Sequence, residues 1–470
     1  METHIPARLA AAGAIASTGL AAALLLLLRP GAETFDAALL AIAAATGAGV
    51  LLLLLFRHPA SGLLLLLFSC LLLPAALDSM LDAKLNAPFL LAPVLVGVWL
   101  LSTARLRTGP AGWMDRLDRP VLLLLLAFAA SFALGQFSSF PRAHAPLRAQ
   151  FGGLAMVLIS GGVYIMASRC CRDPRRLAAL TWLFLLAAAV RLLLLYLPEQ
   201  PAQALHRAAM LPSAPLGSMF WTWFIALAAG QVAANRALGG LAKAGLVLLL
   251  SLAMYLTFVE WREWASGWLP GLVAIAVIVT LRRPRLAVVL LCVALCLAAV
   301  GADEIARAVW TSEQQYSFWS RFAAARVLWD IASQNLLLGL GPANYYHYTP
   351  LYPIFGWHVN FSSHNTYLDL LLQAGLFGLV FYLWTLAALA RHAMRIRHRV
   401  APGFAEGYVY GSIGGLAGAV CAGALGDWVL PFVYNVGVEG FRSAILAWVF
   451  LGGLAALRPR ANEHAEGESS

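Results

Sequence analysis

The sequence predicts an all-α integral membrane protein, a polytopic bundle of about 12 to 14 transmembrane helices with one long outward loop that contains helices. Two features of the composition favour this class. Hydrophobic residues make up 61% of the 470 positions and charged residues only 11%, whereas soluble domains carry about 25% charged residues. Apolar runs also recur along nearly the whole chain. These features exclude a large soluble domain, a disordered chain and a disulfide scaffold.

Apolar stretches that end at charges, proline or glycine are interpreted as 14 membrane spans within one transmembrane domain, residues 1–458. Most have a length close to the roughly 20 residues that a helix needs to cross a bilayer. The predicted spans are residues 9–28, 37–56, 62–77, 88–104, 120–137, 149–168, 177–197, 216–235, 244–259, 267–281, 286–302, 366–390, 408–426 and 438–457. The first span lacks a clear small-residue cleavage site and is therefore expected to remain as a span rather than serve as a signal peptide.

Lysine and arginine residues are distributed unevenly between the two faces of this map. With the amino terminus in the cytoplasm, 21 of the 32 lie on the cytoplasmic side, nine on the other side, and Arg191 and Arg442 within spans. Because cytoplasmic loops carry an excess of Lys and Arg, both termini are predicted to be cytoplasmic. This topology accounts for the net charge of +10 without a nucleic acid partner. Contact with anionic membrane lipids stays open as a second reason for the basic face.

The six cysteines predict neither a disulfide framework nor a metal site. Four lie in spans, and Cys170 and Cys171 lie on the cytoplasmic side, so none is in an outward loop. Cys292 and Cys296 share a helix face, which we interpret as packing because a metal would need further ligands nearby. The polar residues 459–470 are predicted to form a disordered cytoplasmic tail.

One outward connection, residues 303–363, is much longer than the others and is expected to have structure of its own. Residues 317–335 predict an amphipathic helix that lies on the membrane or on the bundle. Its apolar positions are Phe318, Phe322, Ala325, Trp329, Ala332 and Leu336. A turn at 339–342 and a cluster of aromatic residues follow. These aromatic side chains are suited either to stacking on sugars or to an interfacial belt, and both interpretations stay open.

The outward loop returns to the membrane at residues 362–378, with the sequence SSHNTYLDLLLQAGLFG. Thr366 and Asp369 have capping-box spacing, which predicts a helix cap at Thr366 and places His364 two residues before it. The partial positive charge at a helix amino terminus attracts anions and favours a neutral imidazole that can accept a proton. His364 is therefore a candidate catalytic base, and an ordinary surface histidine is the alternative.

The order of these motifs resembles the characteristic region of the bacterial O-antigen ligase and O-antigen polymerase family. The resemblance covers about residues 320–382 and rests on Ser320-Arg321, the Gly339-Leu-Gly-Pro turn and the SHNTYLD run that contains His364. In that family an arginine stands 18 residues before the first glycine of the turn. Arg321 has this spacing to Gly339, and Arg326 does not.

The resemblance implies a polytopic glycosyltransferase of the bacterial inner membrane that uses undecaprenyl-diphosphate-linked glycans at the periplasmic face. It implies His364 as general base on an acceptor hydroxyl and arginines as ligands of the donor diphosphate, with inversion and without a metal or cofactor. The favoured acceptor is the lipid A core oligosaccharide. Alternatives within the family are an O-antigen or exopolysaccharide polymerase and a protein O-oligosaccharyltransferase. A transporter or flippase of lipid-linked sugars is the alternative outside it.

Three arginines are candidates for the diphosphate. Arg321 comes first, since a guanidinium binds phosphate through two hydrogen bonds and is always charged. Arg191 comes second, because an ionisable residue inside a span indicates a function unless it pairs structurally. Arg262 comes third: family members often have Ser-Arg-Gly at this place, although Glu260 and Glu263 offer it ion pairs. Supporting roles are expected for Asn365, Tyr367, Asp369 and Arg326.

Overall fold

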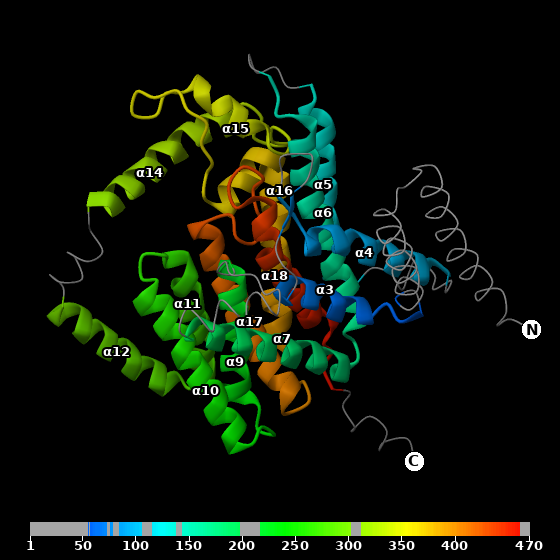
Figure 1. Cartoon of the computed structure of the whole chain (residues 1–470), viewed down its shortest axis with the longest axis vertical. Helices are drawn as coiled ribbons and strands as arrows, with labels where there is room; N and C mark the ends of the chain where they lie inside the picture. The colour runs from blue at the N-terminus through cyan, green and yellow to red at the C-terminus, as the bar shows by residue number, and fades with distance from the viewer. Residues whose placement is uncertain are drawn as a thin grey trace, which may run out of the picture.

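The structure is a computed structural model that describes residues 55, 57–72, 76–78, 84–105, 115–137, 143–197, 217–301 and 312–460. Its described part is almost entirely helical, which confirms the all-α polytopic class (Figure 1). Seven described helices are long and apolar enough to cross a membrane. They are α6 (Leu147–Cys170), α7 (Pro174–Leu195), α10 (Gly240–Tyr255) continued by the π-helical η2 (Leu256–Glu260), α11 (Ala265–Arg282), α16 (Thr366–Ile396), α17 (Phe404–Leu425) and α18 (Gly437–Ala456).

Five shorter apolar helices accompany them. They are α3 (Ser61–Leu72), α4 (Ala87–Arg105), α5 (Arg119–Gly135), α9 (Ser218–Ala234) and α12 (Pro284–Val300). Together the long and short helices coincide with the predicted spans from 62–77 to 438–457. The first two predicted spans, 9–28 and 37–56, lie outside the described residues apart from position 55, as does the predicted tail beyond Arg460. Helices suit these sequences because lipid offers no hydrogen bonds to an open backbone.

Two ends differ from the predicted spans. Helix α3 ends at Leu72, before the predicted limit, and the chain then enters a two-stranded antiparallel pair of β1 (Ala76–Asp78) and β2 (Lys84–Asn86). This pair was not predicted. Helix α16 continues to Ile396, beyond the predicted 390. Its extra turns carry basic residues, which a hydropathy pattern excludes from a span although they do not stop a helix.

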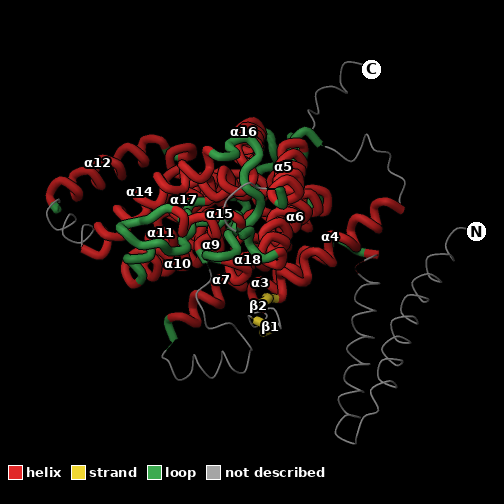
Figure 2. Tube along the Cα trace, turned by 90° about the horizontal axis from the view of Figure 1, so that it is seen from above, coloured by secondary structure: helices red, strands yellow, loops and turns green. Residues whose placement is uncertain are grey.

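The centre of the bundle is formed by α9, α17 and α18, whose side chains are mostly buried. Helices α9 and α17 approach closely: a Cβ atom on Gly230 would collide with the backbone of Gly407 and Gly411. Small residues bring membrane helices together because packing, not hydrophobicity, drives their association in lipid. Helices α10 and α12 expose most of their apolar side chains, and Figure 2 shows α12 at the rim of the molecule.

One end of the bundle is covered by α14 (Ser312–Ser333), α15 (Asn344–Tyr348) and the short 3-10 helix η3 (Thr349–Leu351) (Figure 1). These elements share a small apolar core with α16 and the segment after α17. The stripe of α14 that packs there contains Leu328 and Ile331. The predicted stripe was partly wrong, because Phe322 and Trp329 are exposed and point away from the core.

Helix α16 is interrupted at Gly375, where φ is 64° and ψ is −163°. Backbone groups of α16 that lose their helical partners at this interruption bond instead to residues around the Gly-Leu-Gly turn. Leu340 N donates to Leu372 O at 2.8 Å, and Leu376 N donates to Leu336 O at 2.8 Å. The approach is so close that a Cβ atom on Gly375 would collide with the carbonyl group of Leu337. The turn therefore fixes the end of α14 on α16, about three helical turns below His364.

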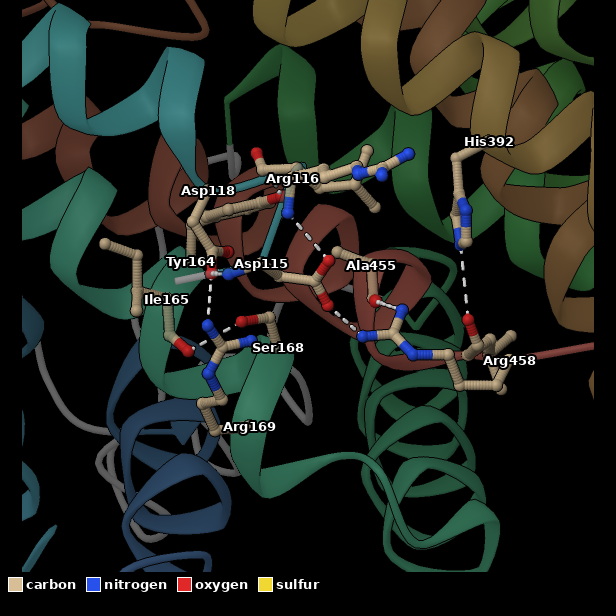
Figure 3. Close-up of polar contacts among 12 residues, drawn as sticks. Asp115, Arg116, Asp118, Tyr164, Ile165, Ser168, Arg169, His392, Ala455 and Arg458 are labelled. Atoms are coloured by element: carbon tan, nitrogen blue, oxygen red, sulfur yellow. Dashed lines mark hydrogen bonds and ion pairs between the residues drawn. The ribbon is translucent and has the colours of Figure 1, made fainter. Parts of the chain in front are cut away.

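The opposite end of the bundle is held by a polar network (Figure 3). Asp118, just before α5, forms a buried ion pair with Arg169 near the end of α6. Asp115 forms an ion pair with Arg458, just after α18. His392 of α16 reaches the Leu457 carbonyl at 3.2 Å. Four helices are thus joined at this end by side chains rather than by packing alone.

Candidate active site

His364 lies in the turn that leads into α16, with a positive φ of 48°. The cap of this helix is Asn365, whose Oδ1 accepts hydrogen bonds from Tyr367 N at 2.9 Å and Leu368 N at 3.1 Å. The predicted capping box, with its cap at Thr366, is therefore wrong, and His364 stands one residue before the cap. An asparagine side chain is short enough to reach the free N–H groups, which is why it is favoured at this position.

The start of α16 is anchored to the end of α17 by three consecutive side chains. Asn365 Nδ2 donates to Ala424 O at 3.1 Å, Thr366 Oγ1 to Gly426 O at 2.9 Å and Tyr367 Oη to Val420 O at 2.7 Å. A positive φ costs about 1–3 kcal/mol for a residue other than glycine. These anchors hold the turn around His364 in that conformation, which explains the supporting positions of Asn365 and Tyr367.

Asp369, the third supporting candidate, is buried inside the first turns of α16. Its Oδ1 accepts a hydrogen bond from the hydroxyl of Tyr345 in α15, and Ser363 N donates to the same Tyr345 oxygen at 3.3 Å. The carboxylate thereby connects α15 to the turn that carries His364. The contacts of Asp369 place it behind the site as a structural support.

A second chain of contacts reaches His364 from the segment between α17 and α18. Asn435 Nδ2 lies 3.0 Å from His364 Nδ1 and also donates to Asp427 Oδ1. Asp427 is fully buried, and its Oδ2 accepts from Phe432 N at 2.7 Å and Val436 N at 3.3 Å. The order Asp427, Asn435, His364 therefore forms a continuous polar relay. The sequence analysis missed Asp427 and Asn435.

The charges around His364 act on its pKa in opposite directions. Burial lowers the pKa of His364 below its usual range, and the positive charge of Arg321 on α14 lowers the pKa further. The negative charge of Asp427 raises it. Nearby charges perturb a pKa in this way, which groups Arg321 with His364 as candidate site residues. A lowered pKa keeps His364 neutral at pH 7, the form that accepts a proton.

Arg326, one turn further along α14, lies differently. Its guanidinium stacks over the ring of Phe322 on the same helix, 4.6 Å from the ring centre. Both side chains are exposed. Arg326 is also not among the charges that shift the pKa of His364. Arg321 and Arg326 therefore differ in their described interactions, and the preference for Arg321 from the spacing to Gly339 stays a prediction.

Arg191 is buried in α7, with 3% of its surface exposed. The charge of another cation, Arg442 of α18, acts on Arg191. Arg442 in turn donates from Nε to the carbonyl of Cys70. Two arginines therefore share the interior of the bundle. None of the contacts described for Arg191 connects it directly with His364.

Arg262 is exposed in the turn between η2 and α11, where its carbonyl accepts a hydrogen bond from Trp268 Nε1 at 3.0 Å. Within the described residues, Arg262 forms no ion pair with Glu260 or Glu263, although the sequence allowed one. Trp264 of the same turn packs on Trp428, with ring centres 5.9 Å apart. Trp428 follows Asp427 directly. The turn of Arg262 therefore borders the segment between α17 and α18 that contacts His364.

Several residues of the predicted aromatic cluster support the site from within. Tyr345 stacks on Phe432 with ring centres 4.7 Å apart, and Tyr346 stacks on Tyr434 at 4.5 Å. Trp357 is 72% exposed on the outer surface. The stacked rings fix the segment after α17 to α15, while exposed rings stay available to a ligand or a membrane surface.

The site therefore combines one imidazole, one buried carboxylate, an amide between them and a guanidinium from α14. Such a set can transfer a proton and hold an anion. Among the described residues, no three histidine, cysteine or carboxylate side chains gather as a metal centre requires.

Comparison with known proteins gives one match. No curated protein sequence matches the chain. A family model described as O-Antigen ligase matches residues 244–383, a range that includes Arg262, Arg321 and His364 but not Arg191 or Asp427. Residues 244–383 of this multi-pass membrane protein thus match the O-antigen ligase family, in agreement with the resemblance found in the sequence.

Proposed function

We propose that this protein is a glycosyltransferase that moves a glycan from undecaprenyl diphosphate to an acceptor hydroxyl at the periplasmic face of the bacterial inner membrane. The observation that carries the proposal is the electrostatic coupling of His364 and Arg321. Both residues fall in the segment that matches the O-antigen ligase family. In this orientation both termini are cytoplasmic and residues 303–363 form the periplasmic loop.

The transfer is proposed as a single displacement with inversion at the anomeric carbon. The acceptor oxygen forms a bond to that carbon while the bond from the carbon to the diphosphate oxygen breaks. His364 takes the hydroxyl proton, and undecaprenyl diphosphate leaves as an anion. Arg321 stabilises the charge that develops on the leaving group, because a guanidinium offers fixed positive charge and two parallel hydrogen bonds.

The relay to Asp427 controls which nitrogen of His364 is free. When Asp427 is charged, the Asn435 amide nitrogen lies between it and Nδ1, so neutral His364 carries its proton on Nε2. When Asp427 is protonated, the reversed amide presents Oδ1 to Nδ1–H and leaves Nε2 free to act as base. We assign catalysis to the second arrangement because it leaves Nε2 free to act as base. Burial raises the pKa of Asp427 above its usual range, which is the direction that this arrangement requires.

This assignment predicts different transfer rates for two substitutions of Asp427. Asp427→Asn retains a neutral donor toward Asn435 and an acceptor for the backbone N–H groups, so it is expected to keep most of the transfer activity. Asp427→Ala leaves those groups unpaired and is expected to lose about tenfold or more, since an orphaned buried donor costs about 1–3 kcal/mol. Initial rates of glycan transfer measure both. Equal loss in the two variants would show that the relay needs a charged Asp427.

Arg191 and Arg262 are proposed as further contacts of the diphosphate. The turn of Arg262 borders the segment of Asp427, so an exposed guanidinium there is available to a membrane-bound donor. Arg191 is buried inside the bundle, and an ionisable residue inside a span indicates a function. Both roles predict a weaker apparent affinity for the donor when the residue is replaced by glutamine.

The proposed function is tested with purified protein in lipid nanodiscs, an undecaprenyl-diphosphate-linked glycan and three acceptors in parallel. The acceptors are lipid A core oligosaccharide, a second lipid-linked glycan and a pilin-like protein. We expect transfer to the lipid A core. His364→Ala is expected to lower the rate by about 10²–10⁴-fold, the usual contribution of a general base, and Arg321→Ala to abolish transfer without unfolding the protein.

Arg326→Ala is the matched control, because it removes an arginine of the same helix that stacks on Phe322 and is not among the charges that shift the pKa of His364. Its rate is expected to stay near that of the wild type. Full activity of His364→Ala, with and without EDTA, would refute the general-base assignment. Transfer to the second glycan or to the protein would instead identify a polymerase or a protein O-oligosaccharyltransferase.

A transporter of lipid-linked sugars is the second candidate, and the buried pair of Arg191 and Arg442 favours it. Transporters commonly hold charged residues inside the bundle to bind a substrate. The same nanodisc assay separates the two functions. A transporter forms no glycan–acceptor product with any of the three acceptors, whereas the transferase does.

A further inference from the structure

A basic pocket lies at the end of the bundle away from His364. It has a volume of about 470 Å³. Its lining residues are Val232, Ala233, Arg236, Lys243, Arg282 and Arg283. A second pocket of about 450 Å³ continues it along residues 282–286 and shares the same two arginines. Nothing in the proposed transfer reaction uses these residues.

Helix α17 spans the distance between this basic pocket and the candidate active site. Glu406 in its first turn pairs with Arg282 at 3.0 Å. At its other end, Val420 and Ala424 accept hydrogen bonds from the cap of α16. The 22 residues of α17 rise by about 33 Å, roughly the thickness of a bilayer core. The basic pocket is therefore a separate site on the opposite face.

Two helix starts adjoin the basic pocket. The turn after α9 leads into α10 at Gly240, and the turn after α11 leads into α12 at Pro284. Gly239, the residue before α10, provides no side-chain cap, and no atom lies within 4 Å of where its Cβ would be. A helix amino terminus has free N–H groups and partial positive charge. The carboxyl ends of α9 and α11 lie at the same pocket, so the partial charges of the helix ends oppose one another. The side chains of the arginines and the lysine therefore supply the positive charge of the pocket.

Arg282 forms the fixed part of the basic pocket. Besides its ion pair with Glu406, its Nε donates to Ala233 O at 3.3 Å and its guanidinium lies 5.3 Å from the ring centre of Tyr410. Arg236 and Arg283 are exposed at the rim. Across the described ranges, neither they nor Lys243 pairs with a carboxylate. Three cations are thus left for an anionic ligand.

The helices that start at the basic pocket present apolar faces to the outside. On α10, Leu241 is 90% exposed and Leu248 is also exposed. On α12, Leu286, Val289 and Leu290 are exposed. A ligand with a phosphate group and hydrocarbon chains matches this combination, whereas a small soluble anion gains nothing from the apolar faces.

We propose that the basic pocket binds the phosphate headgroup of an anionic phospholipid, with the acyl chains along α10 and α12. Pockets of Lys and Arg between membrane helices are suited to such headgroups, and each basic residue contributes about 1 kcal/mol near an anionic surface. The lipid comes from the leaflet opposite the candidate active site. This assignment does not depend on the proposed transferase.

The test uses delipidated protein in a neutral detergent and native mass spectrometry. Phosphatidylglycerol, phosphatidylcholine and glycerol 3-phosphate are titrated separately. Wild-type protein is expected to retain phosphatidylglycerol in preference to the other two. The triple variant Arg236→Gln, Lys243→Gln, Arg283→Gln is expected to bind phosphatidylglycerol roughly a hundredfold more weakly, and each single substitution about fivefold more weakly.

A matched control removes the same charge from exposed arginines elsewhere: Arg172→Gln, Arg175→Gln, Arg391→Gln. Its affinity for phosphatidylglycerol is expected to stay within twofold of the wild type. The proposal is overturned if the pocket variant binds like the wild type, or if the control loses as much, since diffuse charge then explains binding. It is also overturned if glycerol 3-phosphate displaces the lipid at equal concentration, because the site then takes a free anion.

Discussion

His364 depends on residues far from it in sequence for its protonation state. The positive charge of Arg321 on α14 lowers its pKa, and a negative charge on Asp427 after α17 raises it. Asn435 contacts Nδ1 directly. A histidine that serves as base needs a pKa near or below the working pH. In the form that we assign to catalysis Asp427 is neutral, so burial and the charge of Arg321 lower the pKa of His364 and the opposing effect of an Asp427 charge is removed.

The titration of His364 tests this arrangement. Arg321→Gln removes a positive charge and is expected to raise the pKa of His364, and Arg326→Gln is expected to leave it unchanged. In the wild type, activity is expected to rise with pH through the lowered pKa and to level off before neutrality, because only the neutral imidazole accepts a proton. Histidine-labelled NMR at a series of pH values measures the pKa, and an unchanged value in Arg321→Gln would contradict the coupling.

The individual site residues were predictable where the signal was local. His364 and Arg321 lie in recognisable motifs with fixed spacing, and the charge of Arg321 lowers the pKa of His364. Their roles stay predictions. Asp427 and Asn435 were not predictable, since Asn435 lies 71 residues beyond His364 and meets it only through the tertiary fold. An aspartate directly after an apolar span was the one signal that pointed to Asp427.

Among the elements, α16 has the feature that most constrains the site. Its interruption at Gly375 exists because the Gly-Leu-Gly turn supplies the missing hydrogen bonds. The sequence resemblance pointed to the turn but not to its partner. The register between α14 and α16 therefore depends on backbone contacts, which tolerate no side chain at Gly375 or Gly339.

Substitution of Gly375 tests the role of the interruption. Gly375→Ala is expected to lower the free energy of unfolding by about 2–4 kcal/mol, because a positive φ disfavours alanine and its Cβ meets Leu337. Transfer activity is expected to fall as well, since Arg321 loses its fixed position. Thermal unfolding in detergent measures the first effect. Gly97→Ala in α4, where no atom lies within 4 Å, is the control and is expected to change the unfolding free energy by less than about 1 kcal/mol.

The predicted spans matched the described helices well. A segment in lipid must be apolar along its whole length and must form its backbone hydrogen bonds internally, so hydropathy alone locates the helix. Local features were less predictable. The cap of α16 is shifted by one residue, and α14 packs through Leu328, Ile331 and Ala332, of which only Ala332 belongs to the predicted stripe. Asn365 and Thr366 are both suitable cap residues, so the sequence allows a helix start at either one. Helix α14 has apolar residues on two faces, so the sequence does not show which face packs against the bundle.

For the whole molecule, the two ends of the bundle are held differently. The end near His364 is joined by backbone contacts and stacked rings, and the other end by the ion pairs of Figure 3. Burial raises the pKa of Asp118, and Arg169 opposes that rise. The buried pair is thus more sensitive to the loss of one partner than the more exposed pair of Asp115 and Arg458.

The difference between the ion pairs is measurable. Arg169→Ala is expected to destabilise the protein by about 3–5 kcal/mol, because it leaves a buried carboxylate without its cation. Arg458→Ala is expected to cost about 1 kcal/mol or less, as is usual for exposed pairs. Denaturation followed by circular dichroism compares them. Equal effects would show that the burial of Asp118 does not determine the contribution of its pair.

The interruption of α16 also has a consequence for the order in which the chain assembles during synthesis. The Gly-Leu-Gly turn leaves the ribosome before residues 372–376, so its backbone groups have no final partners until the first half of α16 has been made. Asn435 follows later still, just before α18. The contact between Asn435 and His364 thus forms only after the chain has been synthesised as far as the segment between α17 and α18.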